Sequence, residues 1–371
     1  MILSKYPYVV HKEILNNMNY SQLFLLSFVS KNMKKFIKLS QMNRFKSIKS
    51  IEYECDRTDQ PWVHVYHRNT EESIIQIIKR GEDVNGYFQL NVSGKIIDFR
   101  FIYGHRYPIA SYQPSDKEQV FEFIHNYLLD FFGNSVEYNW QAMDFKIRQG
   151  VFIPSIPQLS NVPLCVYMHL FPDRFPSIFQ RRPTEFLHMD QVENFFSSSP
   201  VLKSIKMSVL LGNQSFNPDS KFYQSESIEI RQDKLSAPAI LRHFQGRQAV
   251  IECVEHKTSH LIEFVNRWKS GEAFQKLEYL KIEMFRTPRS RFLNAIGLKH
   301  IDATKQPPTL IFPKVYNWPC FSDRPNTDPI TSHMYVVRAT DNRVASIMIR
   351  RKKLWFGVWD KTEEEFLRMM D

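Results

Sequence analysis

The sequence predicts an α+β protein in which a small N-terminal three-helix unit precedes a mixed α/β region, with additional β-strands before and after that region. Three patterns support this fold class: helical spacing of apolar residues near the start, alternation of strand-like and helix-like segments over residues 185–285, and β-branched and aromatic runs on both sides of it. With 371 residues, of which 43% are hydrophobic, the chain can bury more than one core.

The first fifty residues contain the three predicted helices and most of the net charge. Pro7 suits a first helical turn, and Ile14 and Met18 continue a stripe of apolar residues at every fourth position. Ser21 and Ser30 are candidate caps of the second and third helices. Nine Lys or Arg residues against one acid account for +8 of the net charge of +10. We expect a solvated basic face on the third helix, formed by Lys31, Lys34, Lys35 and Lys38.

The stretch "YPYVVHKEILNNMNYSQLFLLSFVSKNM" resembles the F-box without a gap, from its hydrophobic-Pro start to its "VSK". It departs from the family at Tyr6, where Leu is common, and at Met33, where Trp is common. The resemblance implies docking on an acidic Skp-type adaptor of a cullin-RING ubiquitin ligase. The residues that it places at the adaptor or in the core of the unit are Pro7, Ile14, Met18, Leu23, Leu26, Val29 and Met33. We expect residues 1–42 to suffice for adaptor binding and the rest to fold without them.

Residues 46–184 form a predicted strand-rich region with one long helix at about 115–132. A hairpin is expected about Ser93-Gly94. Ser115 and Glu118 have the spacing of a capping box for the long helix, which Gly133 can end.

Residues 185–285 form a predicted α/β domain with crossover helices, for which irregular turns like leucine-rich repeats are one arrangement, although no regular repeat supports it. The block from "FLHMDQVENFF" to "LEYLKIEMF" resembles the F-box-associated domain, type 2, of a family expanded in roundworms. The resemblance implies a role in holding a protein substrate.

Residues 286–371 contain a proline-rich connector followed by C-terminal strands that turn at "TDNR". The prolines between 307 and 329 forbid a continuous helix, so we expect an extended surface loop. Tyr316, Trp318 and Phe321 of this loop are candidate substrate contacts, with packing on the underlying domain as the alternative.

Motifs for catalysis, cofactors and metals are not found. His256 and His260 have the spacing of metal ligands on a helix, but Lys257 replaces the catalytic Glu of a zinc protease, and Thr258 or Ser259 looks like a helix cap that would separate the two histidines. The four cysteines lie far apart, which disfavours a zinc site or a disulfide framework. "LFLLSFV" is too short to cross a bilayer. We therefore expect a non-enzymatic intracellular protein, in the cytoplasm, the nucleus or both, without membrane or cofactor.

The function predicted from these patterns is that of a substrate-recognition subunit of an SCF-type ubiquitin ligase, with a Skp-type adaptor at the N-terminus and an unidentified protein substrate at the C-terminal region. One alternative is an interaction scaffold outside any ligase. The other is a nucleic-acid binder that uses the four helical lysines and Phe36. No recognised nucleic-acid motif supports this second alternative.

Overall fold

The fold is described from a computed structural model of the chain. The structure divides into two compact units, of which unit 1 centres on residues 1–143 and unit 2 on residues 165–316 and 323–371. The described residues are 7–55, 60–68, 70–81, 86–143, 159, 164–170, 189–209, 215–232, 237–253, 257–283, 289–312 and 327–370.

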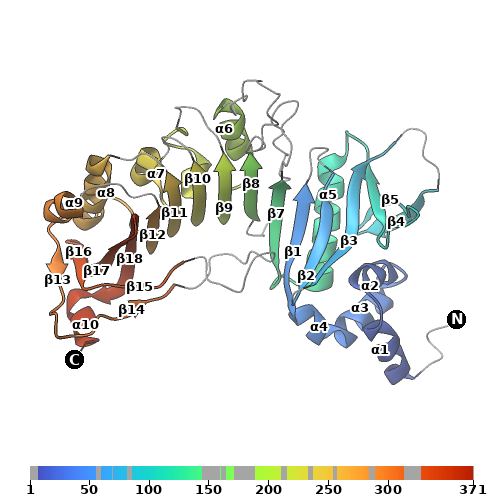
Figure 1. The fold of residues 1–371 in the computed structure, drawn as a ribbon. Helices are drawn as coiled ribbons and strands as arrows, with labels where there is room; N and C mark the ends of the chain where they lie inside the picture. Colours follow the sequence, from blue (N-terminus) through green and yellow to red (C-terminus); the bar gives the residue numbers. More distant parts are fainter. Residues whose placement is uncertain are drawn as a thin grey trace, which may run out of the picture. The chain divides into compact units, whose positions relative to one another are not determined.

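Unit 1 begins with short helices and continues as a mixed sheet crossed by one long helix (Figure 1). Its elements are α1 (Tyr8–Asn16), α2 (Tyr20–Leu26), α3 (Lys31–Ser40), α4 (Met42–Lys46), β1 (Ile48–Cys55), β2 (Trp62–His67), β3 (Thr70–Lys79), β4 (Phe88–Val92), β5 (Lys95–Arg100), β6 (Ile109–Tyr112), α5 (Lys117–Phe132) and β7 (Glu137–Met143).

The strands of unit 1 lie in the order β7-β1-β2-β3-β6-β5-β4, with parallel pairs at β7-β1 and β3-β6 and antiparallel pairs elsewhere. Helix α5 packs on one face of this sheet through buried aromatic side chains. His125 of α5 forms a hydrogen bond of 2.7 Å with the hydroxyl of Tyr53 on β1, and Phe121 packs 6.1 Å from Trp140 on β7. Helix α5 thus contacts strands β1 and β7, and Tyr127 and Phe131 of the same helix contact the N-terminal helices.

Unit 2 alternates strands and helical segments before it ends in antiparallel strands (Figure 1). Its elements are β8 (Leu164–Leu170), α6 (Met189–Ser198), β9 (Ser204–Val209), η2 (Lys221–Gln224), β10 (Ser227–Gln232), α7 (Ala237–His243), β11 (Gln248–Cys253), α8 (Thr258–Ser270), β12 (Tyr279–Glu283), α9 (Arg289–Ala295), β13 (Lys299–His300), β14 (Thr309–Leu310), β15 (Ile330–Thr331), β16 (Met334–Val337), β17 (Arg343–Arg350), β18 (Lys353–Thr362) and α10 (Glu363–Arg368).

Strands β8 to β12 of unit 2 are parallel neighbours in chain order, and β9 to β12 lie in the stretch for which the alternation predicts crossover helices. Helical segments lie between β9, β10, β11 and β12, so each parallel step is made by a crossover. Ile230 and Ile251 are buried on neighbouring strands. Trp268 of α8 packs 5.1 Å from Phe356 of β18, which ties the crossover helices to the C-terminal strands. The observed mixed α/β architecture confirms the predicted fold class.

The C-terminal strands β16, β17 and β18 form an antiparallel meander that joins β12. The chain turns at Asn342, which has a positive φ of 56°, within the predicted "TDNR". The flanks of the proline-rich connector pack on this sheet, because Leu310, Phe312 and Ile330 belong to the same core cluster as Trp355. Residues 313–326, which include Tyr316, Trp318 and Phe321, lie outside the described residues.

Some helix starts confirm the capping residues predicted from the sequence, and others correct them. The Ser30 hydroxyl accepts a hydrogen bond from the Met33 N–H and caps α3, as predicted. Helix α2, by contrast, is capped by Asn19 in a capping box with Gln22, two residues before the predicted Ser21. Either residue has a side chain suited to capping, and the reciprocal bond from Gln22 favours the earlier position.

The long helix and helix α8 also begin differently from the sequence prediction. Helix α5 begins after Asp116 without a side-chain cap, so Ser115 and Glu118 do not form the expected capping box. Helix α8 begins at Thr258 and follows Lys257 as N-cap, so neither Thr258 nor Ser259 caps it. Short polar side chains are frequent near helix starts, and spacing alone does not decide which of them forms the bond.

Candidate partner-binding surface of the N-terminal helices

The N-terminal helices α1 to α4 bury several apolar side chains, of which Leu15 lies outside the stripe predicted through Ile14 and Met18. Leu15, Leu23, Phe24 and Ile37 are almost completely buried, and Phe45 of α4 joins them. Helix α4 was not expected from the sequence, because five residues are too few to establish a helical period. Helices of this length are marginal alone, so their stability depends on packing.

Much of that packing comes from helix α5, which lies about a hundred residues later in the chain. Phe24 packs 5.7 Å from Tyr127 and 6.5 Å from Phe131, in each case edge to face. Phe28 stacks on Tyr127 at 4.3 Å, and the Ser27 hydroxyl forms a buried hydrogen bond of 2.7 Å with the Tyr127 hydroxyl. The helices therefore share one aromatic core with α5.

A half-buried carboxylate fixes the start of helix α2 to strand β3. The Glu72 carboxylate accepts hydrogen bonds from the backbone N–H groups of Tyr20 and Ser21, the second at 3.2 Å. Burial raises the pKa of Glu72, while these two bonds and nearby Arg44 oppose the rise. A negative charge next to the first N–H groups of a helix is stabilising, so Glu72 positions α2.

The basic face of helix α3 differs from the sequence prediction. Lys31 and Lys35 are exposed, but the Lys34 and Lys38 ammonium groups lie 2.6 and 2.9 Å from the carboxylate of Asp130 on α5. Lys34 also lies over the ring of Tyr127, 3.5 Å from its centroid, and burial lowers its pKa. Two of the four lysines therefore belong to the contact between helices rather than to a solvated face.

The sequence-predicted adaptor contacts fall into three groups by exposure. Pro7 and Val29 are exposed, and 70% of the Val29 surface is accessible. Leu23 is completely buried, because α2 turns this side chain into the core, and a contact of Leu23 with the adaptor stays a prediction. The half-buried residues are Ile14, Met18, Leu26 and Met33.

Two exposed apolar residues of α1 are not among the predicted adaptor contacts. Val9 is 74% accessible and Val10 is also exposed. Val10 lies in the apolar stripe that continues through Ile14, which indicates that part of this stripe faces away from the core. Exposed apolar side chains near Pro7 and Val29 are typical of a protein interface.

A scan against protein-family models identifies the helical segment. Residues 7–45 match the F-box domain. The match begins at Pro7 and ends at Phe45, so it also includes most of helix α4. Comparison with curated proteins and with solved structures found no match. The resemblance of residues 185–285 to the type 2 F-box-associated domain, and with it the roundworm family, stays a prediction.

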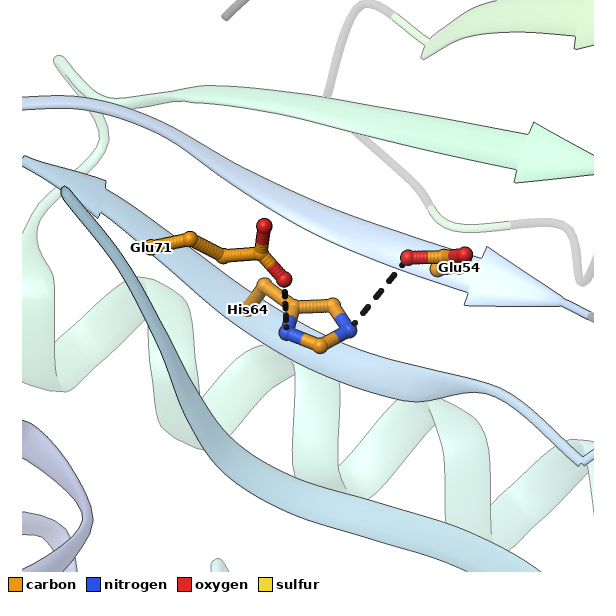
Figure 2. Close-up of side chains that lie close together, drawn as sticks. All are labelled: Glu54, His64 and Glu71. Atoms are coloured by element: carbon orange, nitrogen blue, oxygen red, sulfur yellow. Dashed lines mark ion pairs between the residues drawn. The ribbon is translucent and has the colours of Figure 1, made fainter. Parts of the chain in front are cut away.

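Unit 1 also brings together Glu54, His64 and Glu71, which come from neighbouring strands β1, β2 and β3 (Figure 2). Glu71 lies 3.1 Å from Nδ1 of His64, and Glu54 lies 3.6 Å from Nε2 (Figure 2). Burial lowers the pKa of His64, and the charge of Glu71 opposes this effect. Sequence reasoning missed this cluster, because its members become neighbours only through strand pairing.

The geometry of this cluster fits hydrogen bonding better than metal binding. The two carboxylates lie at opposite nitrogens of one imidazole, so an ion bound at either nitrogen is separated by the ring from the other carboxylate. A divalent metal needs its ligand atoms about 2 Å from a single point. The Ser73 hydroxyl, 3.2 Å from Nδ1, offers a further hydrogen-bonding partner.

The metal candidate predicted from the sequence consists of His256 and His260, of which the structure describes only His260. His260 lies in the first turn of α8, whereas His256 is outside the described residues. F-box proteins are generally non-catalytic adaptors, and the absence of catalysis in this chain stays a prediction. Within the described ranges, every helix is too short or too polar to cross a lipid bilayer.

Proposed function

We propose that this protein is a substrate-recognition subunit of an SCF-type cullin-RING ubiquitin ligase. Its F-box domain binds a Skp-type adaptor inside the cell, in the cytoplasm, the nucleus or both. The observation that carries the proposal is the coincidence of the F-box match with exposed apolar side chains at Pro7, Val9 and Val29. Ile14, Met18, Leu26 and Met33 complete the proposed surface with half-buried side chains.

The mechanism that follows is placement rather than catalysis by this chain. The adaptor ties the F-box end to the subunits that carry activated ubiquitin, while another part of the chain holds a target. A lysine of the target then meets the ubiquitin thioester at a high effective concentration. The shared core of the F-box helices and α5 supports this mechanism, because it gives the adaptor a firm attachment to unit 1.

The target-binding part is proposed to be the C-terminal region, with residues 185–285 as a substrate-recognition domain. Tyr316, Trp318 and Phe321 remain candidate contacts, since aromatic side chains dominate many interface hot spots. A scaffold outside any ligase uses the same surfaces without ubiquitin transfer. Nucleic-acid binding is less well supported than the sequence suggests, because Lys34 and Lys38 pair with Asp130.

The proposal is tested with the Val29→Asp variant and a purified Skp-type adaptor. An unpaired charge in a desolvated interface costs several kcal/mol, so we expect the adaptor affinity to fall about a hundredfold. Val29 is exposed, and circular dichroism should therefore show an unchanged fold. The matched control is Val201→Asp, because Val201 is also exposed but lies in unit 2, before β9.

Binding of the adaptor by the wild-type chain distinguishes the ligase function from the scaffold function. Capture of the adaptor by wild type and by Val201→Asp, with loss in Val29→Asp, is the expected result. Failure of the wild-type chain to bind any Skp-type adaptor would refute the ligase assignment and favour the scaffold. Mass spectrometry of proteins that co-purify with the intact chain reports the adaptor and the target together.

A further inference from the structure

A row of aromatic side chains connects the F-box domain with the β4–β5 hairpin of the same unit. Phe28, in the turn that follows α2, lies 6.1 Å from Phe99 on β5, ring centroid to centroid. Phe99 lies 6.1 Å from Phe88 on β4, and Phe88 stacks on Phe101 at 5.6 Å with nearly parallel rings. A continuous row of aromatic rings therefore runs from the F-box to the loop that follows β5.

This row begins at half-buried Phe28, passes through the core and ends in solvent. Phe99 is completely buried, Phe28 and Phe88 are half-buried, and 57% of Phe101 is accessible. Tyr103, two residues further, is fully exposed. At the other end of the row, Val29 follows Phe28 directly and is itself exposed. Large apolar side chains displayed next to one another in this way are typical of a binding surface.

The loop between β5 and β6 is also basic. Residues 101–108, which form this loop, contain Arg106 and no Asp or Glu. Arg106 and the neighbouring His105 are exposed. On the F-box side, Lys31 and Lys35 of α3 are exposed as well. The two ends of the surface thus have the same sign of charge, which complements a single acidic partner.

We propose that Phe101, Tyr103 and Arg106 extend the adaptor-binding surface beyond the F-box domain. This inference rests on the proposed function, since the occupant is the same Skp-type adaptor that docks at Val29. Phe101 and Tyr103 supply apolar anchors, and Arg106 attracts acidic side chains of the adaptor. Continuity with the F-box through Phe28 and the shared charge favour this occupant over a separate target protein.

The test compares adaptor affinity of the full-length chain with that of two loop variants, Tyr103→Ala and Phe101→Ala/Tyr103→Ala. Aromatic anchors are frequent hot spots, so we expect the double variant to bind about tenfold more weakly. Tyr103 is fully exposed, and its single variant therefore keeps the fold while still weakening binding. The matched control is Ile311→Ala, since Ile311 is 64% accessible in unit 2 and should not affect the affinity.

A charge variant tests the electrostatic part of the inference. Arg106→Glu should lower the association rate with the adaptor, and the difference from wild type should shrink as salt is raised from 50 to 300 mM, about the range over which screening strengthens. A purely structural role of Arg106 would instead change the melting temperature and show no such salt dependence.

The outcomes separate this inference from the proposed function. If the wild-type chain binds the adaptor and the loop variants bind it equally well, the extended surface is wrong while the F-box assignment stands. The extended surface is also wrong, and the F-box assignment stands, if the loop variants still bind the adaptor but no longer bind another co-purifying protein. If the wild-type chain does not bind the adaptor, the proposed function fails and this inference fails with it.

Discussion

Replacement of Phe24 by Ala tests whether the F-box helices and helix α5 form one cooperative structure. Phe24 is completely buried and packs against Phe28, Tyr127 and Phe131, with ring centroids 5.0 to 6.5 Å away. Truncating a buried Phe to Ala costs about 3–5 kcal/mol through lost burial and the cavity that remains. Two of these three partners belong to α5, so we expect the substitution to destabilise α5 as well.

Hydrogen–deuterium exchange of the full-length chain measures this coupling. If α2 and α5 open together, a loss of about 3–5 kcal/mol accelerates amide exchange in α5 by a factor between roughly one hundred and a few thousand, at ~1.4 kcal/mol per factor of ten. Peptides that cover Lys117–Phe132 report on α5 directly. The control is Val9→Ala, because Val9 lies in the F-box domain but is mostly exposed and should leave α5 protection unchanged.

The opposite result has a clear meaning. If Phe24→Ala accelerates exchange in Tyr20–Leu26 and leaves α5 at its wild-type protection, the F-box helices fold separately from the rest of the chain. That outcome would support the sequence-based expectation that the remaining chain folds without residues 1–42. It would also refute the shared aromatic core as a cooperative structure.

Two further predictions concern a buried acid and a crowded glycine. Burial raises the pKa of Glu52 to about 8, although Asn139 and Ser50 donate hydrogen bonds to it. The folded state then binds a proton that the unfolded state releases between pH 4.5 and about 8, so stability falls as pH rises through this window. Glu52→Gln should remove this loss, so its free energy of unfolding should exceed that of wild type by roughly 3–5 kcal/mol at pH 8 and differ little at pH 4. Denaturant unfolding at both pH values measures the difference, and an equal pH dependence in both proteins would contradict the prediction. Gly246→Ala would place a methyl group 2.0 Å from the Ser225 carbonyl oxygen, which is backbone and yields little. We expect it to destabilise unit 2 by about 1–3 kcal/mol, seen as a melting temperature lower by several degrees, and an unchanged melting temperature would exclude this close contact.

Local features of the fold were predictable because their signals lie within a few residues of each other. Ser30 caps α3 through a bond to a residue three positions later, and Thr362 forms a capping box with Glu365 in the same way. The turn at Ser93-Gly94 needs two positive φ angles, which the structure has at 54° and 106°. Spacing and residue type determine such features without knowledge of the remaining chain.

The sequence also determined the F-box domain itself, since the order of Pro7, the apolar positions and "VSK" is a linear pattern that the match at residues 7–45 confirms. The pattern did not determine which of its side chains are buried and which are exposed. Leu23 and Val29 are both apolar and lie six residues apart, yet one is completely buried and the other is 70% accessible. Amphipathic spacing marks a stripe but does not tell how much of the stripe a later element covers.

Only the tertiary structure decided the surroundings of Lys34, Glu72 and His64. Asp130 pairs with Lys34 and Lys38 and lies 92 residues from Lys38 in the chain. Glu72 accepts a hydrogen bond from the backbone N–H of Tyr20, which lies 52 residues earlier. The carboxylates around His64 meet it through the pairing of β1, β2 and β3. Contacts between residues so far apart depend on strand register and helix docking, which are set by the burial of the whole unit, and no local pattern in the sequence encodes them.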